Sequence, residues 1–135
     1  MTGAARAAYA TAHLSEIPTL ASDLVEGEWK PVRYHFGISA FGVNAYVGRA
    51  EGELVIEEHA EGDDGHEELY VVLEGQARFT IAGETFDATA GTFVFVAPTA
   101  TRMAVAREPG TVVLALGAAA GRAFAPSEWE RSRTT

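Results

Sequence analysis

Apolar and polar residues alternate along much of the chain, in short runs that end at glycine or proline. The run at 77–81 is the clearest, because its first, third and fifth residues are apolar and the two between them are polar. A period of two indicates a strand with one buried face, and the following Ala82-Gly83 predicts a tight hairpin turn. On the same grounds we expect strands at 32–36, 43–49, 54–59, 67–73, 85–87, 93–96, 102–106 and 111–116.

Little of the chain has a helical pattern. Near the end, Ser127 can cap a short helical turn that places Glu128 and Glu130 close to its beginning. Residues 1–30 are interpreted as an N-terminal arm and loop, with 9–14 either a first strand or a frayed arm. Many short strands with few helices predict an all-β fold, an antiparallel sandwich or small barrel spanning 31–117, followed by a C-terminal tail at 118–135.

Two of the expected strands are apolar on both faces. In 67–73 the residues on one face are Glu68, Tyr70 and Val72, and those on the other are Leu69, Val71 and Leu73. Phe93 and Phe95 likewise lie opposite Val94 and Val96. A sheet with one face in water would alternate more strictly, so another sheet, the N-terminal arm or a second subunit must cover the second face. We expect a homodimer.

Composition narrows the classes of partner. The 135 residues suit one domain, and the formal net charge of -9 repels phosphate backbones, which argues against nucleic acid as a partner. No apolar run approaches the ~18 residues of a membrane-spanning helix, so we expect no membrane partner. The chain has no cysteine, which excludes disulfides and thiolate metal sites and fits a reducing compartment, so we expect a cytoplasmic protein.

The apolar strand expected at 67–73 contains an ionisable residue, Glu68, and another, His66, lies directly before it. A buried charge must be paired, hydrogen-bonded or bound to a metal. Arg102 or Arg33 could neutralise Glu68; without a cation, Glu68 could act as a general acid or base with His66 as its partner. Alternatively His59, His66 and Glu68 form a set suited to Fe(II), Zn(II) or Mn(II). The plainer interpretation is that both histidines are solvated beside a polar loop and that Glu68 is structural.

The same segment resembles a known family. Six residues separate Glu68 from Gly75, like the end of the first cupin motif, G-x5-H-x-H-x3,4-E-x6-G, and residues 90–98 are similar to the approach to the second, G-x5-P-x-G-x2-H-x3-N. The resemblance covers about residues 43–117. It implies a double-stranded β-helix, the jelly-roll cupin barrel, whose lumen holds a ligand or a metal.

The motif's metal ligands are largely missing. Its first two histidines would fall at 62 and 64 or at 61 and 63, where the chain has glycine, aspartate or glutamate. Its last histidine would fall at Arg102 when aligned on Gly91, or at Met103 when aligned on Pro98. The resemblance therefore carries over one ligand position of four, Glu68.

These observations favour a small cupin-like protein that binds a small organic ligand in the lumen. The expected ligand-binding residues are Tyr46, Tyr70, Phe95, Arg102 and Met103. The alternatives are a metal-dependent, oxygenase-type enzyme, a cofactor-free isomerase or cyclase that uses His59, His66 and Glu68, and a structural or regulatory partner-binding module. The cofactor is accordingly either none or a divalent transition metal.

Overall fold

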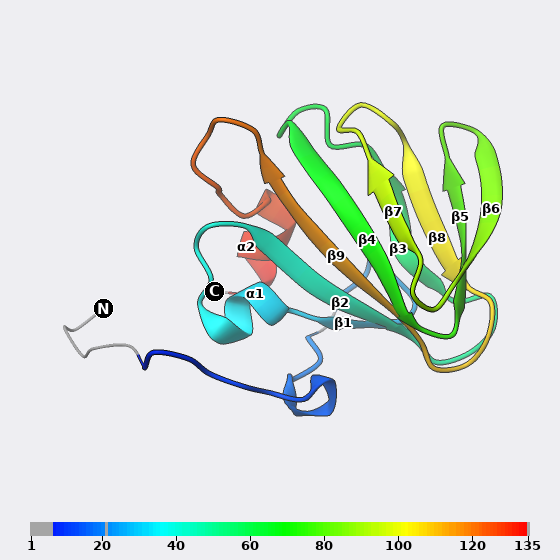
Figure 1. The fold of residues 1–135 in the computed structure, drawn as a ribbon, viewed down its shortest axis with the longest axis horizontal. Coiled ribbons are helices and arrows are strands. Elements are labelled where there is room, and N and C mark those ends of the chain that lie inside the picture. Colours follow the sequence, from blue (N-terminus) through cyan, green and yellow to red (C-terminus); the bar gives the residue numbers. More distant parts are fainter. Residues whose placement is uncertain (1–6, 21, 135) are drawn as a thin grey trace.

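Two antiparallel β-sheets face each other and enclose the core of the molecule (Figure 1). The computed structural model describes residues 7–20 and 22–134. One sheet has five strands in the order β1-β2-β9-β4-β7, and the other has four in the order β3-β8-β5-β6. Neighbours in the sheets are often far apart in sequence, as when β9 lies between β2 and β4. The arrangement is the jelly-roll barrel that the motif resemblance implied.

The strands agree closely with the sequence pattern, apart from the first. They are β1 (Glu28–Lys30), β2 (Gly42–Gly48), β3 (Leu54–His59), β4 (His66–Glu74), β5 (Gln76–Ile81), β6 (Glu84–Thr89), β7 (Phe93–Val96), β8 (Arg102–Ala106) and β9 (Thr111–Ala119). The expected turn at Ala82-Gly83 joins β5 to β6, with φ values of 50° and 84°. Positive φ at both residues is characteristic of the tight turns that fit the twist of a hairpin.

The expected strand at 32–36 is wrong, because Val32–Phe36 forms the helix α1. Pro31 precedes the helix and Gly37 ends it with φ 70°, where the Gly37 amide bonds back to the carbonyls of Arg33 and Tyr34. Proline before a helix and glycine after it are common boundary signals. The alternation of residue types in this segment is thus compatible with either structure.

Two details concern the N-terminal part. Of the two alternatives for 9–14, the strand is not formed, and a short 3-10 helix, η1, occupies Leu14–Glu16. Conversely, β1 lies within the segment expected to be a loop, and it pairs with β2 so that Trp29 stands beside Tyr46. Trp29 is fully buried, and its burial explains why a segment of only three residues is held in the sheet.

The core lies between the sheets. Its buried residues are Val55, Ile56, Tyr70, Val72, Ala77, Phe79, Ala88, Val94, Val96, Ala104, Ala106, Val113 and Ala115. They come from strands of both sheets, and most lie at alternate positions, as a period of two requires. Val55 and Ile56 are consecutive, and the register of β3 against β8 shifts at this point.

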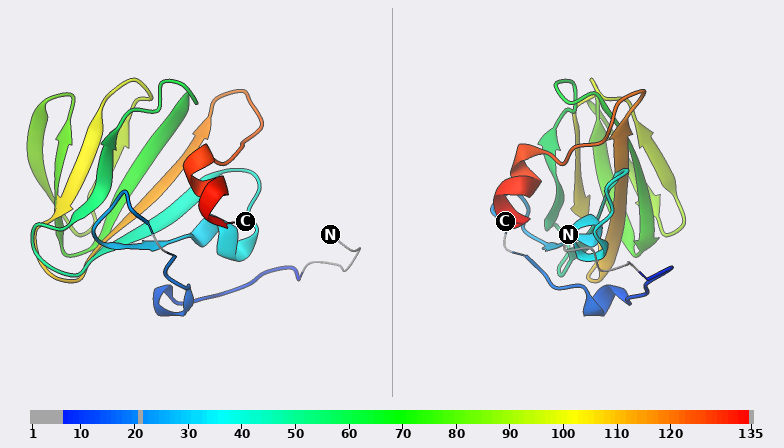
Figure 2. Two further views of the ribbon diagram at one scale, coloured as in Figure 1. Left: turned by 180° about the vertical axis from the view of Figure 1, so that it is seen from behind. Right: turned by 90° about the vertical axis from the view of Figure 1, so that its left-hand side faces the viewer.

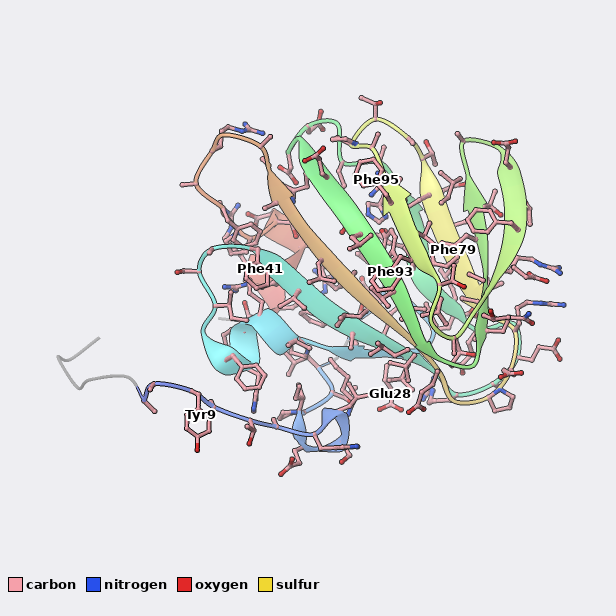
Figure 3. The ribbon with its side chains drawn as sticks, in the orientation of Figure 1. Tyr9, Glu28, Phe41, Phe79, Phe93 and Phe95 are labelled. Atoms are coloured by element: carbon pink, nitrogen blue, oxygen red, sulfur yellow. The ribbon has the colours of Figure 1, made fainter. Side chains whose placement is uncertain are left out.

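The outward face of β4 and β7 stays largely uncovered. Phe93 and Phe95 are 67% and 61% exposed, while Val94 and Val96 between and beside them are buried. Figure 3 shows the two phenylalanines on the near side of the sheet, well away from Tyr9 in the N-terminal arm. The arm residues that the structure describes therefore do not cover this face, and the expected homodimer stays a prediction.

The two α-helices lie at one end of the barrel, opposite the β5–β6 hairpin (Figure 2). The second, α2 (Glu128–Thr134), confirms the expected C-terminal turn, and the Ser127 hydroxyl accepts a hydrogen bond of 3.3 Å from the Glu130 amide. Within the described part of the chain, no helix has the length and apolar character needed to cross a membrane.

Candidate functional site

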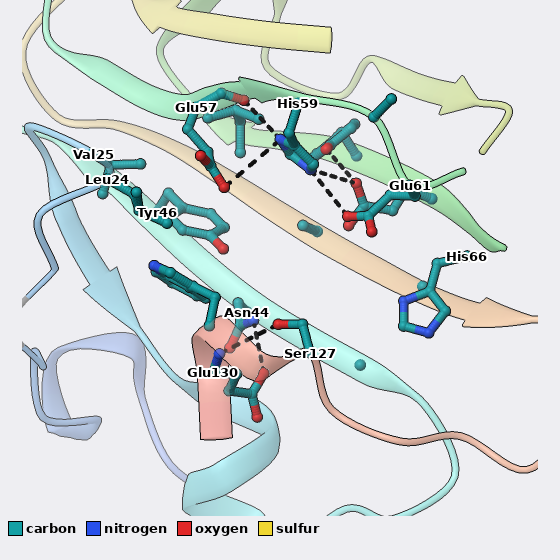
Figure 4. Close-up of a pocket in the computed structure, with 18 of the residues that line it drawn as sticks. Leu24, Val25, Asn44, Tyr46, Glu57, His59, Glu61, His66, Ser127 and Glu130 are labelled. Carbon is teal, nitrogen blue, oxygen red and sulfur yellow. Dashed lines mark hydrogen bonds and ion pairs between the residues drawn. The ribbon is translucent and has the colours of Figure 1, made fainter. Parts of the chain in front are cut away.

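A cavity of about 280 Å³ opens between the inner faces of the strands and the C-terminal segment (Figure 4). Its walls are formed by Leu24, Val25, Gly42, Asn44, Tyr46, Ile56, Glu57, His59, Ala60, Glu61, His66, Glu68, Tyr70, Ala115, Gly117, Phe124, Ser127, Trp129 and Glu130. Strands β2, β3, β4 and β9 supply the barrel side, and the segment around α2 supplies the other. We call this cavity the barrel pocket.

Glu68 points into the barrel pocket from β4 and is held by two partners. Arg102 Nη1 donates a hydrogen bond of 2.7 Å to Glu68 Oε1, and the Tyr70 hydroxyl donates to the same oxygen. Gly117, paired with Glu68 in the neighbouring strand, leaves the space this side chain needs. A Cβ at position 117 would lie 3.0 Å from Glu68 Cγ, tighter than ordinary packing allows.

His59, at the end of β3, has an acceptor at each ring nitrogen. Its Nδ1 lies 2.7 Å from the Glu57 carbonyl oxygen and its Nε2 lies 3.0 Å from Glu61 Oε1. Only the doubly protonated ring can donate to both. Burial opposes that charge, but the hydrogen bonds and the nearby carboxylates outweigh it and raise the pKa of His59 above its ordinary value.

The pKa values of the two carboxylates beside His59 shift in opposite directions. Burial raises the pKa of Glu57, whose side chain is half-buried and whose Oε1 is 4.0 Å from His59 Nδ1. Burial also acts to raise the pKa of Glu61, but the hydrogen bond from His59 prevails, so the net shift is downward. The pocket therefore holds a carboxylate whose pKa is raised near one whose pKa is lowered.

The opposite wall carries a second ion pair, between Arg33 and Glu130. Arg33 Nε donates a 2.5 Å hydrogen bond to Glu130 Oε2, and Asn44 Nδ2 reaches Glu130 Oε1 at 3.4 Å. Asn44 Oδ1 and Trp129 Nε1 are buried and have no hydrogen-bond partner within residues 7–20 and 22–134. In Figure 4, Asn44 and Glu130 face the group of Glu57, His59 and Glu61 across the pocket.

His66 lies at the side of the pocket, where its ring stacks on Phe124 with centroids 5.6 Å apart. Like Glu68, it lines the cavity, as the shared strand face predicts. It does not join His59 and Glu68 in one group of ligand atoms. Instead His59, Glu61 and Glu68 offer atoms within 4.8 Å of one another, and His66 does so with Glu61 and Asp64.

The expected ligand-binding residues divide into three groups. Tyr46 and Tyr70 line the pocket. Arg102 is fully buried behind Glu68 and touches the pocket through that carboxylate. Phe95 and Met103 lie outside it: Phe95 is 61% exposed and borders a shallow hollow on the outer face of the sheet, and Met103 follows the inward Arg102 on β8, so strand alternation turns it outward. For these two residues the lumen assignment is corrected.

Several pocket residues were not anticipated from the sequence. Glu57 shares the inward face of β3 with His59, two positions away, and that spacing is a usable signal. Glu61, Trp129 and Glu130 come from a loop and a terminal helix. Their convergence on the pocket depends on tertiary packing, which strand periodicity does not describe.

The resemblance to cupins implies a metal held by three histidines and a glutamate, and the residues present do not fit that set. Glu68 Oε1 is already bonded to a guanidinium cation and to the Tyr70 hydroxyl. The contacts of His59 favour the protonated ring, which has no lone pair to offer a metal. The Arg102 guanidinium and the protonated His59 ring thus already occupy the groups that lie closest to the metal position of the motif.

Comparisons with known proteins agree on the fold. A family model described as "Cupin domain" matches residues 46–116. A cupin protein from Bacteroides fragilis is 20% identical, with 81% of this chain and 91% of that chain covered and a TM-score of 0.62. A Cupin 2 conserved barrel domain protein from Salinispora arenicola is 17% identical, with 82% and 89% covered and a TM-score of 0.65.

A third similar structure is that of a named enzyme. It is a sugar phosphate isomerase from a cupin superfamily, from Silicibacter pomeroyi, 17% identical, with 80% of this chain and 74% of that chain covered and a TM-score of 0.65. At such identities the likeness concerns the fold alone. No curated protein matches the chain.

Proposed function

Since the chain belongs to the cupin family, we propose that its barrel pocket binds a small organic molecule that is either uncharged and polar or positively charged. The observation that carries the proposal is the charge of the walls. Four carboxylates, those of Glu57, Glu61, Glu68 and Glu130, line the pocket, and no lysine or arginine is among its described lining residues. The cationic groups that contact these carboxylates are each already paired with one of them: Arg33 with Glu130, Arg102 with Glu68, and the His59 ring with Glu61.

This charge distribution argues against an anionic substrate. A phosphate group is usually bound by arginine, lysine or a helix N-terminus. Here it would meet carboxylates instead, so we do not extend the sugar phosphate activity described for the Silicibacter pomeroyi protein to this chain. Because the residues do not fit the metal set, we also propose no metal-dependent reaction.

The rest of the pocket wall supplies apolar surface and polar atoms that have no hydrogen-bond partner. Tyr46, Phe124 and Trp129 offer ring faces, on which a flat or cationic group can pack. The buried Asn44 Oδ1 and Trp129 Nε1 have no hydrogen-bond partner among the described residues. Buried polar atoms normally find a partner, and a bound ligand could provide it. A volume of about 280 Å³ suits a molecule of roughly one ring.

A matched set of probes tests the proposal. Calorimetric titrations with cyclohexylamine, cyclohexanol and cyclohexanecarboxylate compare a cation, a neutral molecule and an anion of similar shape. We expect the amine or the alcohol to bind and the carboxylate to bind most weakly. Preferential binding of the carboxylate, or of phenyl phosphate added as a second anion, would contradict the proposal.

Variants of β3 sharpen the comparison. Glu57→Gln keeps the shape of a pocket side chain and removes its charge, so affinity for the amine should fall by roughly fivefold, about 1 kcal/mol. Glu58→Gln is the matched control, because Glu58 is the exposed neighbour on the other face of the strand. Equal effects of the two changes would mean that only the overall charge matters.

Acid–base catalysis without a cofactor is the second candidate, favoured by the contact of His59 with Glu61 beside the half-buried Glu57. In this version His59 delivers a proton and a nearby carboxylate, Glu57 or Glu68, accepts one, the pattern of an isomerase or cyclase. Deuterium exchange into a weakly acidic C–H probe such as cyclohexanone, followed by NMR, tests it. His59→Gln should abolish any exchange above the buffer rate, and identical rates for wild type and variant would exclude this role.

A further inference from the structure

Arg102 is the only buried arginine among the described residues, and its burial is complete. It begins β8, where Arg102, Ala104 and Ala106 form the inward, buried face. On the neighbouring strand it is paired in register with His59. A guanidinium inside a barrel is costly unless every part of it is paired, so its contacts define what it does there.

All three nitrogens of this guanidinium donate hydrogen bonds. Nη1 donates to Glu68 Oε1 at 2.7 Å, Nη2 to the Ala97 carbonyl at 2.8 Å and Nε to the Ala100 carbonyl at 3.0 Å. The planar group thus ties β4 to the turn that precedes β8. Because three directions are fixed at once, the positive charge is held at one point rather than on a mobile side chain.

The Arg102 guanidinium lies at the position where the family motif places its metal ion. Glu68 is the one motif ligand that this chain retains, and Arg102 stands at the motif's last histidine position when aligned on Gly91. The oxygen that Arg102 contacts also lies 3.9 Å from His59 Nε2 and accepts the Tyr70 hydroxyl. Imidazole, phenol and guanidinium therefore converge on a single carboxylate oxygen.

We propose that Arg102 is the built-in cation of this barrel, a guanidinium that takes the place of the divalent metal and pairs permanently with Glu68. The pocket is then free for an organic ligand on its other side. This inference is independent of the ligand's identity and of the charge preference proposed above. It predicts that the barrel excludes metal ions because a fixed positive charge already occupies the position that they would take.

Metal content tests the proposal directly. Wild type, Arg102→His and Arg102→Lys are incubated separately with Mn²⁺, Co²⁺, Ni²⁺ and Zn²⁺, dialysed, and analysed by mass spectrometry for bound metal. We expect wild type and Arg102→Lys, which keeps the positive charge, to hold far less than one equivalent. Arg102→His removes the fixed charge and restores a ligand type of the motif, so its metal affinity should rise by about tenfold or more.

Arg78→His is the matched control, because Arg78 pairs with Asp87 on the outside of the four-stranded sheet. It introduces the same residue without touching the pocket and should leave metal binding unchanged. The visible absorption of Co²⁺ then reports whether an ion gained by Arg102→His has nitrogen and oxygen ligands within the protein.

The wild-type measurement decides the matter even if Arg102→His does not fold. A wild type that remains metal-poor with every ion supports the built-in cation. Stoichiometric metal that survives dialysis of the wild type would overturn it, as would an Arg102→His variant that folds and gains no metal. None of these outcomes depends on whether the amine and alcohol probes bind, so the two proposals can fail separately.

Discussion

Arg33 and Glu130 form a largely buried ion pair, with Nε and Oε2 2.5 Å apart, that connects α1 to α2 across 97 residues of sequence. Arg33 Nη1 also donates to the Ile38 carbonyl at 2.9 Å. The pair therefore fixes the C-terminal helix, and with it one wall of the pocket, to the segment that enters β2.

Removing one partner of this pair should be costly. Arg33→Gln leaves the Glu130 carboxylate buried without its cation, so we expect the free energy of unfolding to fall by about 3 kcal/mol in urea titrations. Arg78→Gln, which breaks an exposed ion pair with Asp87, serves as the control and should have a much smaller effect. Similar losses in both variants would show that the helix is not held by this contact.

The ionisation of His59 should make stability depend on pH. Its folded-state pKa is raised above the ordinary value of 6.5, so the stabilisation is fully present below pH 6.5 and is lost as pH rises through the folded-state pKa. Urea unfolding of wild type across this range should show the loss, and His59→Gln should abolish it. An NMR titration that places the pKa of His59 at or below 6.5 would contradict the prediction.

The space beside Glu68 depends on Gly117. Gly117→Ala would place a Cβ 2.9 Å from the Glu67 carbonyl oxygen and 3.0 Å from Glu68 Cγ. We expect a loss of about 1–3 kcal/mol in the free energy of unfolding, measured by urea denaturation, because β4 and β9 must separate slightly. Gly62→Ala is the control, since a Cβ there meets no atom within 4 Å, and it should be nearly neutral.

The exposed rings of β7 lead us to predict a dimer in solution. Light scattering after gel filtration should give twice the chain mass of 14.3 kDa. Phe93→Ser combined with Phe95→Ser should shift the mass toward the monomer, because it removes apolar surface that a second subunit would cover. Tyr34→Ser removes an aromatic ring that is also exposed, but on α1, and should leave the mass unchanged.

Periodicity was sufficient to predict most of the barrel. Eight of the nine strands, from β2 to β9, follow runs of alternating or doubly apolar residues bounded by glycine or proline. It failed for α1, because five residues between Pro31 and Gly37 are too few to distinguish a helix from a strand by spacing alone. It missed β1 because that strand has only three residues, and the burial of its Trp29 depends on tertiary neighbours that a local pattern does not reveal.

The site was predicted in part, for similar reasons. Strand parity correctly put His66, Glu68 and Tyr70 into one pocket. Arg102 and Met103 are adjacent on one strand, so they could not both face the lumen, and the structure selects Arg102. Glu61 and Glu130 arrive from outside the strands, where no repeating pattern exists to indicate a direction.

The contact between Trp29 and Trp129 has a practical consequence. These are the only two tryptophans in the chain, and their rings lie 4.5 Å apart, one in the sheet and one in the C-terminal helix. Indoles this close couple their electronic transitions and give a paired positive and negative band in circular dichroism. The protein therefore carries an intrinsic optical reporter, and displacement of α2 by an entering molecule would be visible without any label.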